Sequence, residues 1–172
     1  MKKKIFLIFL LFLPFPVIGQ GFDVKLPDGY RLPRKSDYPE YEQLYFKNNF
    51  PYQIEADFDK NGRVDTALLL IKTDNSGWSL FVLMKSENDQ INQLKLDDTK
   101  QNVPYLYMGI SVLGPGEFKT ACGKGYWDCK RGEPAILKLK APAINYFAFE
   151  SANSAFYWVE NLRKFSRIWL SD

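Results

Sequence analysis

The pattern of apolar and polar positions predicts β-strands along most of the chain after residue 51. Residues 66–73 and 78–85 are apolar almost without alternation, and Asp74-Asn75-Ser76-Gly77 separates them. Two such runs joined by a short loop of turn-forming residues predict a β-hairpin. Because neither run alternates with polar residues, we expect both faces of the hairpin to be covered, as in the middle of a sheet.

Shorter apolar runs predict the remaining strands. Residues 91–96 alternate between apolar and polar side chains, which predicts a half-exposed strand. We find no internal repeat and no linker, so residues 20–172 are expected to form a single β-rich domain. The predicted strands are residues 52–56, 66–73, 78–85, 91–96, 105–113, 135–139, 146–149, 155–159 and 165–170.

One short helix is predicted near residues 38–48. Ser36 and Asp37 precede Pro39 and Glu40, which is the order of cap, first-turn proline and acidic residue that begins many helices. With this N-terminal helix and about eight strands, the predicted fold class is mostly β. We expect an antiparallel sandwich or a strongly curved sheet, with the helix on one side.

The amino-acid composition excludes some classes of function. The chain has no histidine, which excludes histidine-dependent catalytic triads and histidine-ligated zinc. Lysine and arginine number 23 against 20 aspartates and glutamates, but Lys2, Lys3 and Lys4 lie in the segment 1–19, and the rest is formally neutral. A neutral chain has no general field for nucleic acid, so no nucleic-acid partner is expected.

Residues 1–19 have the layout of a signal peptide. Lys2–Lys4 precede an apolar run over residues 5–13, and Val17-Ile18-Gly19 offers a cleavage point near Gly19. The alternative is a membrane anchor, but a spanning helix needs about 20 apolar residues, and two prolines interrupt this run. No later run is long enough, so we expect an exported protein, periplasmic or extracellular, without a transmembrane segment in the mature chain.

Cys122 and Cys129 are the only two cysteines, in a segment that contains Gly123 and Gly125. In an oxidising compartment such an isolated pair predicts a structural disulfide. The alternative is a redox-active pair, although catalytic cysteines usually lie two residues apart.

The most specific motif is Asp-Phe-Asp-Lys-Asn-Gly-Arg-Val-Asp at residues 57–65. Oxygen-bearing side chains recur at alternate positions, and a glycine allows the sharp turn with which a loop wraps a hard cation such as calcium. Residue 68 is leucine where a helical EF-hand has glutamate, and the flanks read as strands, so the motif is not an EF-hand. The predicted calcium ligands are the side chains of Asp57, Asp59, Asn61 and Asp65, with the carbonyl of Arg63.

Residues 52–70 resemble the strand, Asp-rich loop and strand unit of FG-GAP and VCBS repeats. The resemblance implies that residues 57, 59, 61, 63 and 65 hold calcium in a β-hairpin loop. It covers a single unit, and the chain has no array of such repeats. The general layout also resembles small exported bacterial proteins of unassigned function.

We therefore expect a non-enzymatic exported binding or interaction protein in which calcium has a structural role. Its expected partner is a protein of the cell envelope, as for an inhibitor or immunity protein, or an envelope glycan. The alternative is a small Asp/Glu-dependent hydrolase, which would need a deep acidic pocket beside Asp57 and Asp65. A second alternative is that the loop is a plain metal-free turn, because Asp, Asn and Gly all favour turns. The aromatic run at residues 156–158 reads as core with one exposed face, or alternatively as a sugar-stacking platform.

Overall fold

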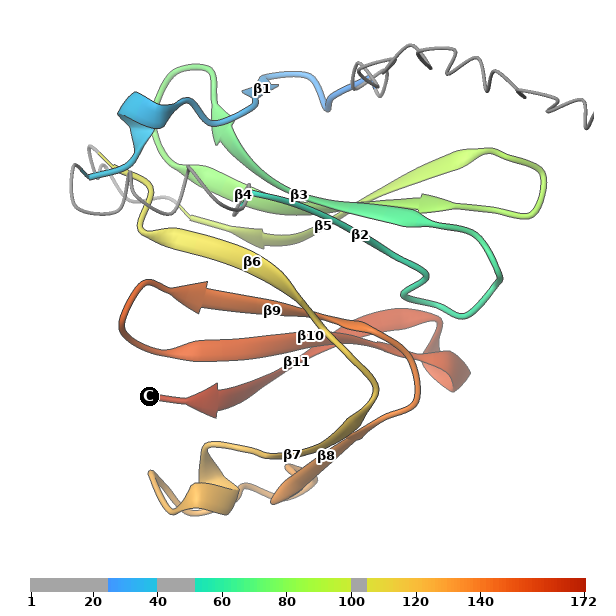
Figure 1. Cartoon of the computed structure of the whole chain (residues 1–172), viewed down its shortest axis with the longest axis vertical. Coiled ribbons are helices and arrows are strands. Elements are labelled where there is room, and N and C mark those ends of the chain that lie inside the picture. The colour runs from blue at the N-terminus through green and yellow to red at the C-terminus, as the bar shows by residue number, and fades with distance from the viewer. Residues whose placement is uncertain (1–24, 40–51, 100–104) are drawn as a thin grey trace, which may run out of the picture.

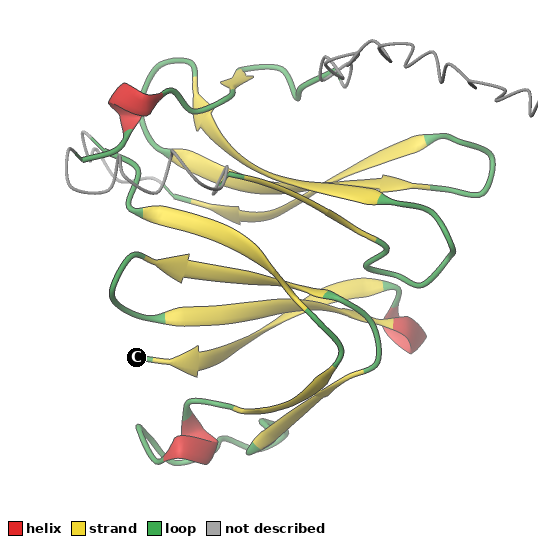
Figure 2. Ribbon diagram, in the orientation of Figure 1, coloured by secondary structure: helices red, strands yellow, loops and turns green. Residues whose placement is uncertain are grey.

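The computed structural model describes residues 25–39, 52–99 and 105–172. The predicted signal peptide lies outside the described residues. The described chain is mostly β and forms two antiparallel sheets and a separate two-stranded ribbon (Figure 1 and Figure 2). No helix among the described residues is long and apolar enough to cross a membrane.

The first sheet has the strand order β1-β3-β4-β5, and β2 also pairs with β3. The second sheet has the order β11-β10-β9-β6, and β7 pairs with β8 in the ribbon. The strands of the first sheet are β1 (Tyr30–Arg31), β2 (Gln53–Ala56), β3 (Asp65–Lys72), β4 (Trp78–Lys85) and β5 (Ile91–Asp98). The others are β6 (Met108–Leu113), β7 (Gly116–Lys119), β8 (Ile136–Leu139), β9 (Ala143–Ala148), β10 (Asn153–Val159) and β11 (Lys164–Ser171).

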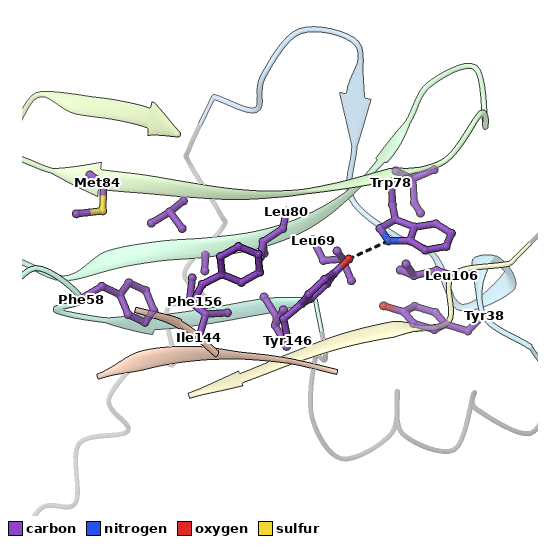
Figure 3. Packing of buried hydrophobic residues seen from close by; sticks show 14 residues of the cluster. Tyr38, Phe58, Leu69, Trp78, Leu80, Met84, Leu106, Ile144, Tyr146 and Phe156 are labelled. Atoms are coloured by element: carbon purple, nitrogen blue, oxygen red, sulfur yellow. Dashed lines mark hydrogen bonds between the residues drawn. The ribbon is translucent and has the colours of Figure 1, made fainter. Parts of the chain in front are cut away.

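The main core lies between the two sheets. Alternate residues of β3 and β4, such as Leu69 and Leu80, pack against Ile144 and Phe156 of the second sheet. Figure 3 shows this layer, in which Trp78 and Tyr146 also meet across the interface. The two sheets therefore pack face to face as the predicted antiparallel sandwich.

The outer face of each sheet is also covered in part. Leu68 and Phe81 of the β3–β4 hairpin face away from the main core and pack with Leu26 and Tyr30 of the N-terminal segment. This confirms the prediction that both faces of the hairpin are covered. On the second sheet, β8 of the ribbon packs on the outer face. The buried residues of this outer cluster are Leu137, Leu139, Ala143, Ala155, Ile168 and Leu170.

The ribbon is the bent end of a long hairpin. Strands β6 and β9 pair up to Leu113 and Ala143, and the pairing resumes in the ribbon at Gly116 and Leu139. Gly114 and Pro115 lie at the bend. The bend folds β7 and β8 over the second sheet, as Figure 1 shows.

The predicted helix at residues 38–48 is wrong at its start. Tyr38 is extended, with φ −101° and ψ 147°, and only a single 3-10 turn, Lys35–Asp37, precedes it. The Asp37 carboxylate accepts hydrogen bonds from the Arg31 guanidinium and from the Arg34 N–H, so it closes this turn. Residues 40–48 lie outside the described residues. The other 3-10 turns described are Cys122–Lys124 and Glu160–Leu162, and the described ranges contain no α-helix.

The strand count also differs from the prediction. The described ranges contain eleven strands, and β1 and β7 were not predicted. Strand β6 begins at Met108, three residues later than expected. The predicted hairpin at residues 66–73 and 78–85 is confirmed as β3 and β4, and residues 91–96 form part of the edge strand β5.

Candidate metal centre in the loop between β2 and β3

The Asp-rich motif forms the connection between two paired strands. Strand β2 ends at Ala56 and β3 begins at Asp65, and these two residues are register partners. The chain reverses through Lys60 and Gly62, whose φ angles are 60° and 82°. Glycine adopts this left-handed conformation without steric cost, which explains its place in the motif.

Three of the predicted ligands converge. One carboxylate oxygen from each of Asp57, Asp59 and Asp65 can be chosen so that all three lie within 4.8 Å of one another. Asp57 and Asp59 are half-buried, and Asp65 is fully buried. Carboxylate oxygens grouped in this way are the donor set that a hard divalent cation prefers.

Backbone N–H groups also contact these carboxylates. Asp57 accepts from the N–H groups of Asn61 at 3.0 Å and Gly62 at 2.9 Å. Asp65 accepts from the N–H groups of Phe58 at 3.0 Å and Lys85 at 2.8 Å. A carboxylate has about four lone-pair sites, so each of these side chains keeps acceptor capacity for a cation.

Asn61 and Arg63, the other two predicted ligand positions, make contacts that tie the loop to its neighbours. The Asn61 amide donates to Asp59 Oδ2 at 3.1 Å and to the Lys85 carbonyl at 2.9 Å. Its Oδ1 accepts from the Arg63 N–H at 2.8 Å. The Arg63 guanidinium donates to the Glu87 carbonyl at 3.3 Å. That its own carbonyl is a ligand stays a prediction.

The electrostatics of the cluster disfavour three bare anions. Burial, reinforced by the nearby Asp59 and Asp57 carboxylates, raises the pKa of Asp65 to about 6, despite the hydrogen bonds that it accepts. Burial also raises the pKa of Asp59, and Asp57 adds to this effect. A bound cation would offset both the burial and the repulsion.

A groove of about 670 Å³ lies beside the loop. Neither Asp57 nor Asp65 lines it, so it differs from the acidic pocket that would favour a hydrolase. Its lining carries charged side chains of both signs, and the loop between β2 and β3 contributes one edge. The lining includes Asp59, Asn61, Lys85, Glu87, Trp158 and Arg163.

Sequence reasoning did not place the turn after β4 or the turn after β10 beside this loop. The position of the turn after β4 could have been predicted. An antiparallel β3–β4 hairpin brings the end of β4 next to the start of β3, and Thr66 indeed pairs with Leu83. The position of the turn after β10 could not have been predicted, because Trp158 and Arg163 reach the groove only through the packing of the two sheets.

The predicted disulfide is present between Cys122 and Cys129, and the described residues contain no free cysteine. It closes the segment between β7 and β8, and neither cysteine belongs to the loop between β2 and β3. Both cysteines are thus used in one structural bond.

Comparisons with known proteins assign no family to this chain: no family model, curated protein or solved structure matches it.

Proposed function

We propose that this protein is an exported binding protein whose β2–β3 loop is held by a structural calcium ion. The observation that carries the proposal is the convergence of the Asp57, Asp59 and Asp65 carboxylates. The ligand set would be these carboxylates with Asn61 and the Arg63 carbonyl, as in the FG-GAP and VCBS units that the segment resembles.

The attachment of the loop to its neighbours supports a structural role for the ion. Asn61 and Asp65 both bond to the backbone of Lys85, and Arg63 bonds to the backbone of Glu87. A bound cation would neutralise the repulsion among the carboxylates. It would therefore stabilise the contact between the β2–β3 loop and the turn after β4. The same loop borders the groove beside Asp59, so its order would shape a binding surface.

Export is supported by the disulfide as well as by residues 1–19. Disulfides persist in oxidising compartments and are rare in the cytosol. The proposed partner is a protein or a glycan of the cell envelope.

The proposal is tested by adding calcium to the EGTA-treated protein while following both heat of binding and thermal unfolding. We expect saturable binding and a higher melting temperature, because an ion that binds only the folded state stabilises it. Magnesium is the control cation, since it requires tighter octahedral geometry. No heat and no thermal shift with several millimolar calcium would show that the loop is a metal-free turn.

A further inference from the structure

The phenol of Tyr30 lies among charged side chains on the outer face of the first sheet. Tyr30 belongs to β1, and its ring packs edge-on against Phe81 of β4, with 4.8 Å between the ring centres. The ammonium of Lys95, on β5, donates a hydrogen bond to the Tyr30 hydroxyl at 3.0 Å. The same ammonium lies 5.4 Å from the centre of the Tyr30 ring and 5.6 Å from that of Phe81, so the two rings help to hold it in position.

A second hydrogen-bonding group reaches the same phenol oxygen. The hydroxyl of Ser79, which is fully buried on β4, lies 3.2 Å from the Tyr30 hydroxyl and 2.7 Å from Asp98 Oδ1. A serine hydroxyl carries one proton and rotates to suit its partners, so Ser79 can donate that proton to Tyr30 when the phenol is ionised. A Tyr30 phenolate would therefore accept two hydrogen bonds, one of them from a cation.

The charges around this oxygen favour the phenolate. Burial is the largest single influence and raises the pKa of Tyr30, but the hydrogen bonds from Lys95 and Ser79 outweigh it, and the pKa lies below its ordinary value of 10.0. The hydrogen bond to Tyr30 raises the pKa of Lys95, so this ammonium stays charged. The Asp98 carboxylate disfavours a second anion, but Lys72 pairs with it at 2.9 Å. More of the nucleophilic phenolate is therefore available near neutral pH than for an ordinary tyrosine.

Exposure alone points to a different tyrosine. Tyr126 keeps 53% of its surface exposed and Tyr105 keeps 43%, whereas Tyr30 is half-buried. A reagent that followed accessibility would modify Tyr126 before Tyr30. The order in which these tyrosines react therefore separates chemical activation from exposure.

We propose that Tyr30 is an activated nucleophile and, among the described tyrosines, the preferred site of O-acylation by an acyl electrophile. The Tyr30 oxygen attacks the carbonyl carbon of the acyl group, and the bond from that carbon to the leaving group breaks. The leaving group departs with the electron pair, and solvent transfers the phenol proton to it. This modification site goes beyond the proposed binding role, and it shares no residue with the loop between β2 and β3.

The test is acetylation of the full chain by N-acetylimidazole at neutral pH in EGTA, which releases imidazole. Peptide mass spectrometry at successive times identifies the modified tyrosines. We expect Tyr30 to be acetylated before Tyr126. Lys95→Met, which keeps an apolar side chain over the two rings, should slow the acetylation of Tyr30 about three- to tenfold and leave Tyr126 unchanged. Lys95→Arg keeps the cation and should retain more of the rate. The matched control is Lys164→Met, because Lys164 is an exposed strand lysine of the other sheet.

Acetylation of Tyr126 before Tyr30 would overturn the proposal, as would an unchanged Tyr30 rate in Lys95→Met or an equal loss of rate in Lys164→Met. Thermal unfolding of each variant shows whether it is folded. The order of acetylation in the unchanged protein decides the proposal even if Lys95→Met does not fold. Calcium is absent throughout, so neither outcome depends on the calcium proposal.

Discussion

The indole Nε1 of Trp78 donates a hydrogen bond to the Tyr146 hydroxyl at 3.2 Å, and this bond joins the two sheets inside the core (Figure 3). Both side chains are almost completely buried, at 5% and 2% exposure. Burial raises the pKa of Tyr146 to about 12, so the hydroxyl is neutral at physiological pH. The pair is thus a polar contact between the two sheets, within the main core.

Tyr146→Phe should lower the free energy of unfolding by about 1–3 kcal/mol, because the buried Trp78 N–H would lose its acceptor. Urea denaturation measures this change. Tyr126→Phe is the control, since Tyr126 is 53% exposed and its substitution should have almost no effect. An equal stability of Tyr146→Phe and the unchanged protein would mean that the hydrogen bond contributes little.

Asp59→Ala should abolish the stabilisation by calcium and leave the protein folded, because the apolar contacts of β3 do not involve this side chain. In the unchanged protein we expect a dissociation constant of about 10⁻⁴ to 10⁻³ M and a rise in melting temperature of about 2–5 °C at millimolar calcium. Asp74→Ala is the matched control. Asp74 is also a turn aspartate, and it accepts a hydrogen bond from the Ser76 N–H in the β3–β4 turn. A calcium shift that survives Asp59→Ala would exclude this loop as the site.

Asp65→Asn should flatten the pH dependence of stability in calcium-free buffer. The pKa of Asp65 is about 6 in the folded protein against an ordinary value of 3.8, so the folded state holds this proton more tightly than the unfolded chain. The contribution of this proton to the free energy of unfolding is complete below the ordinary pKa of 3.8. It is lost as the pH rises through the folded-state pKa of about 6. Denaturation midpoints across this pH interval should therefore decline more steeply for the unchanged protein than for Asp65→Asn.

Calcium should have its greatest effect at the upper end of that interval, because a carboxylate ligand must be deprotonated. Parallel pH profiles of the two proteins in EGTA would contradict the prediction for Asp65. A calcium effect that falls as the pH rises would contradict the ligand role of the cluster.

Gly123→Ala should destabilise the disulfide-closed segment. A Cβ at this position would lie 1.9 Å from the Ala135 carbonyl oxygen. That oxygen also accepts a hydrogen bond from the Thr120 N–H at 3.1 Å, so relieving the clash would disturb this contact. We expect a loss of about 1–3 kcal/mol by urea denaturation. Gly114→Ala is the control, because a Cβ there meets nothing within 4 Å. Equal stability of the two variants would show that the segment adjusts without cost.

The local features of the fold were predictable from the sequence. Apolar runs separated by Asp74-Asn75-Ser76-Gly77 predicted the β3–β4 hairpin and its covered faces, because strand periodicity and turn chemistry act between near neighbours. The close spacing of Cys122 and Cys129 likewise predicted their disulfide. The grouping of three aspartates followed from alternate positions in one short loop.

The start of the predicted helix failed for a tertiary reason. Asp37 has the chemistry of a helix cap, but its carboxylate bonds to Arg31 on β1, and Tyr38 is buried in the core between the sheets. A strand as short as β1 carries almost no periodic signal of its own. It forms because β3 offers a pairing edge and because Tyr30 covers Phe81.

The groove beside Asp59 was decided only by the tertiary structure. The aromatic run at residues 156–158 shows the difference: Phe156 is in the core, Tyr157 packs against the outer cluster of the second sheet, and Trp158 lines the groove. Alternation along a strand determines that neighbouring side chains face opposite ways. Which distant residues meet each face depends on how the sheets stack and where the β6–β9 hairpin bends, and no pattern within a single segment contains that information.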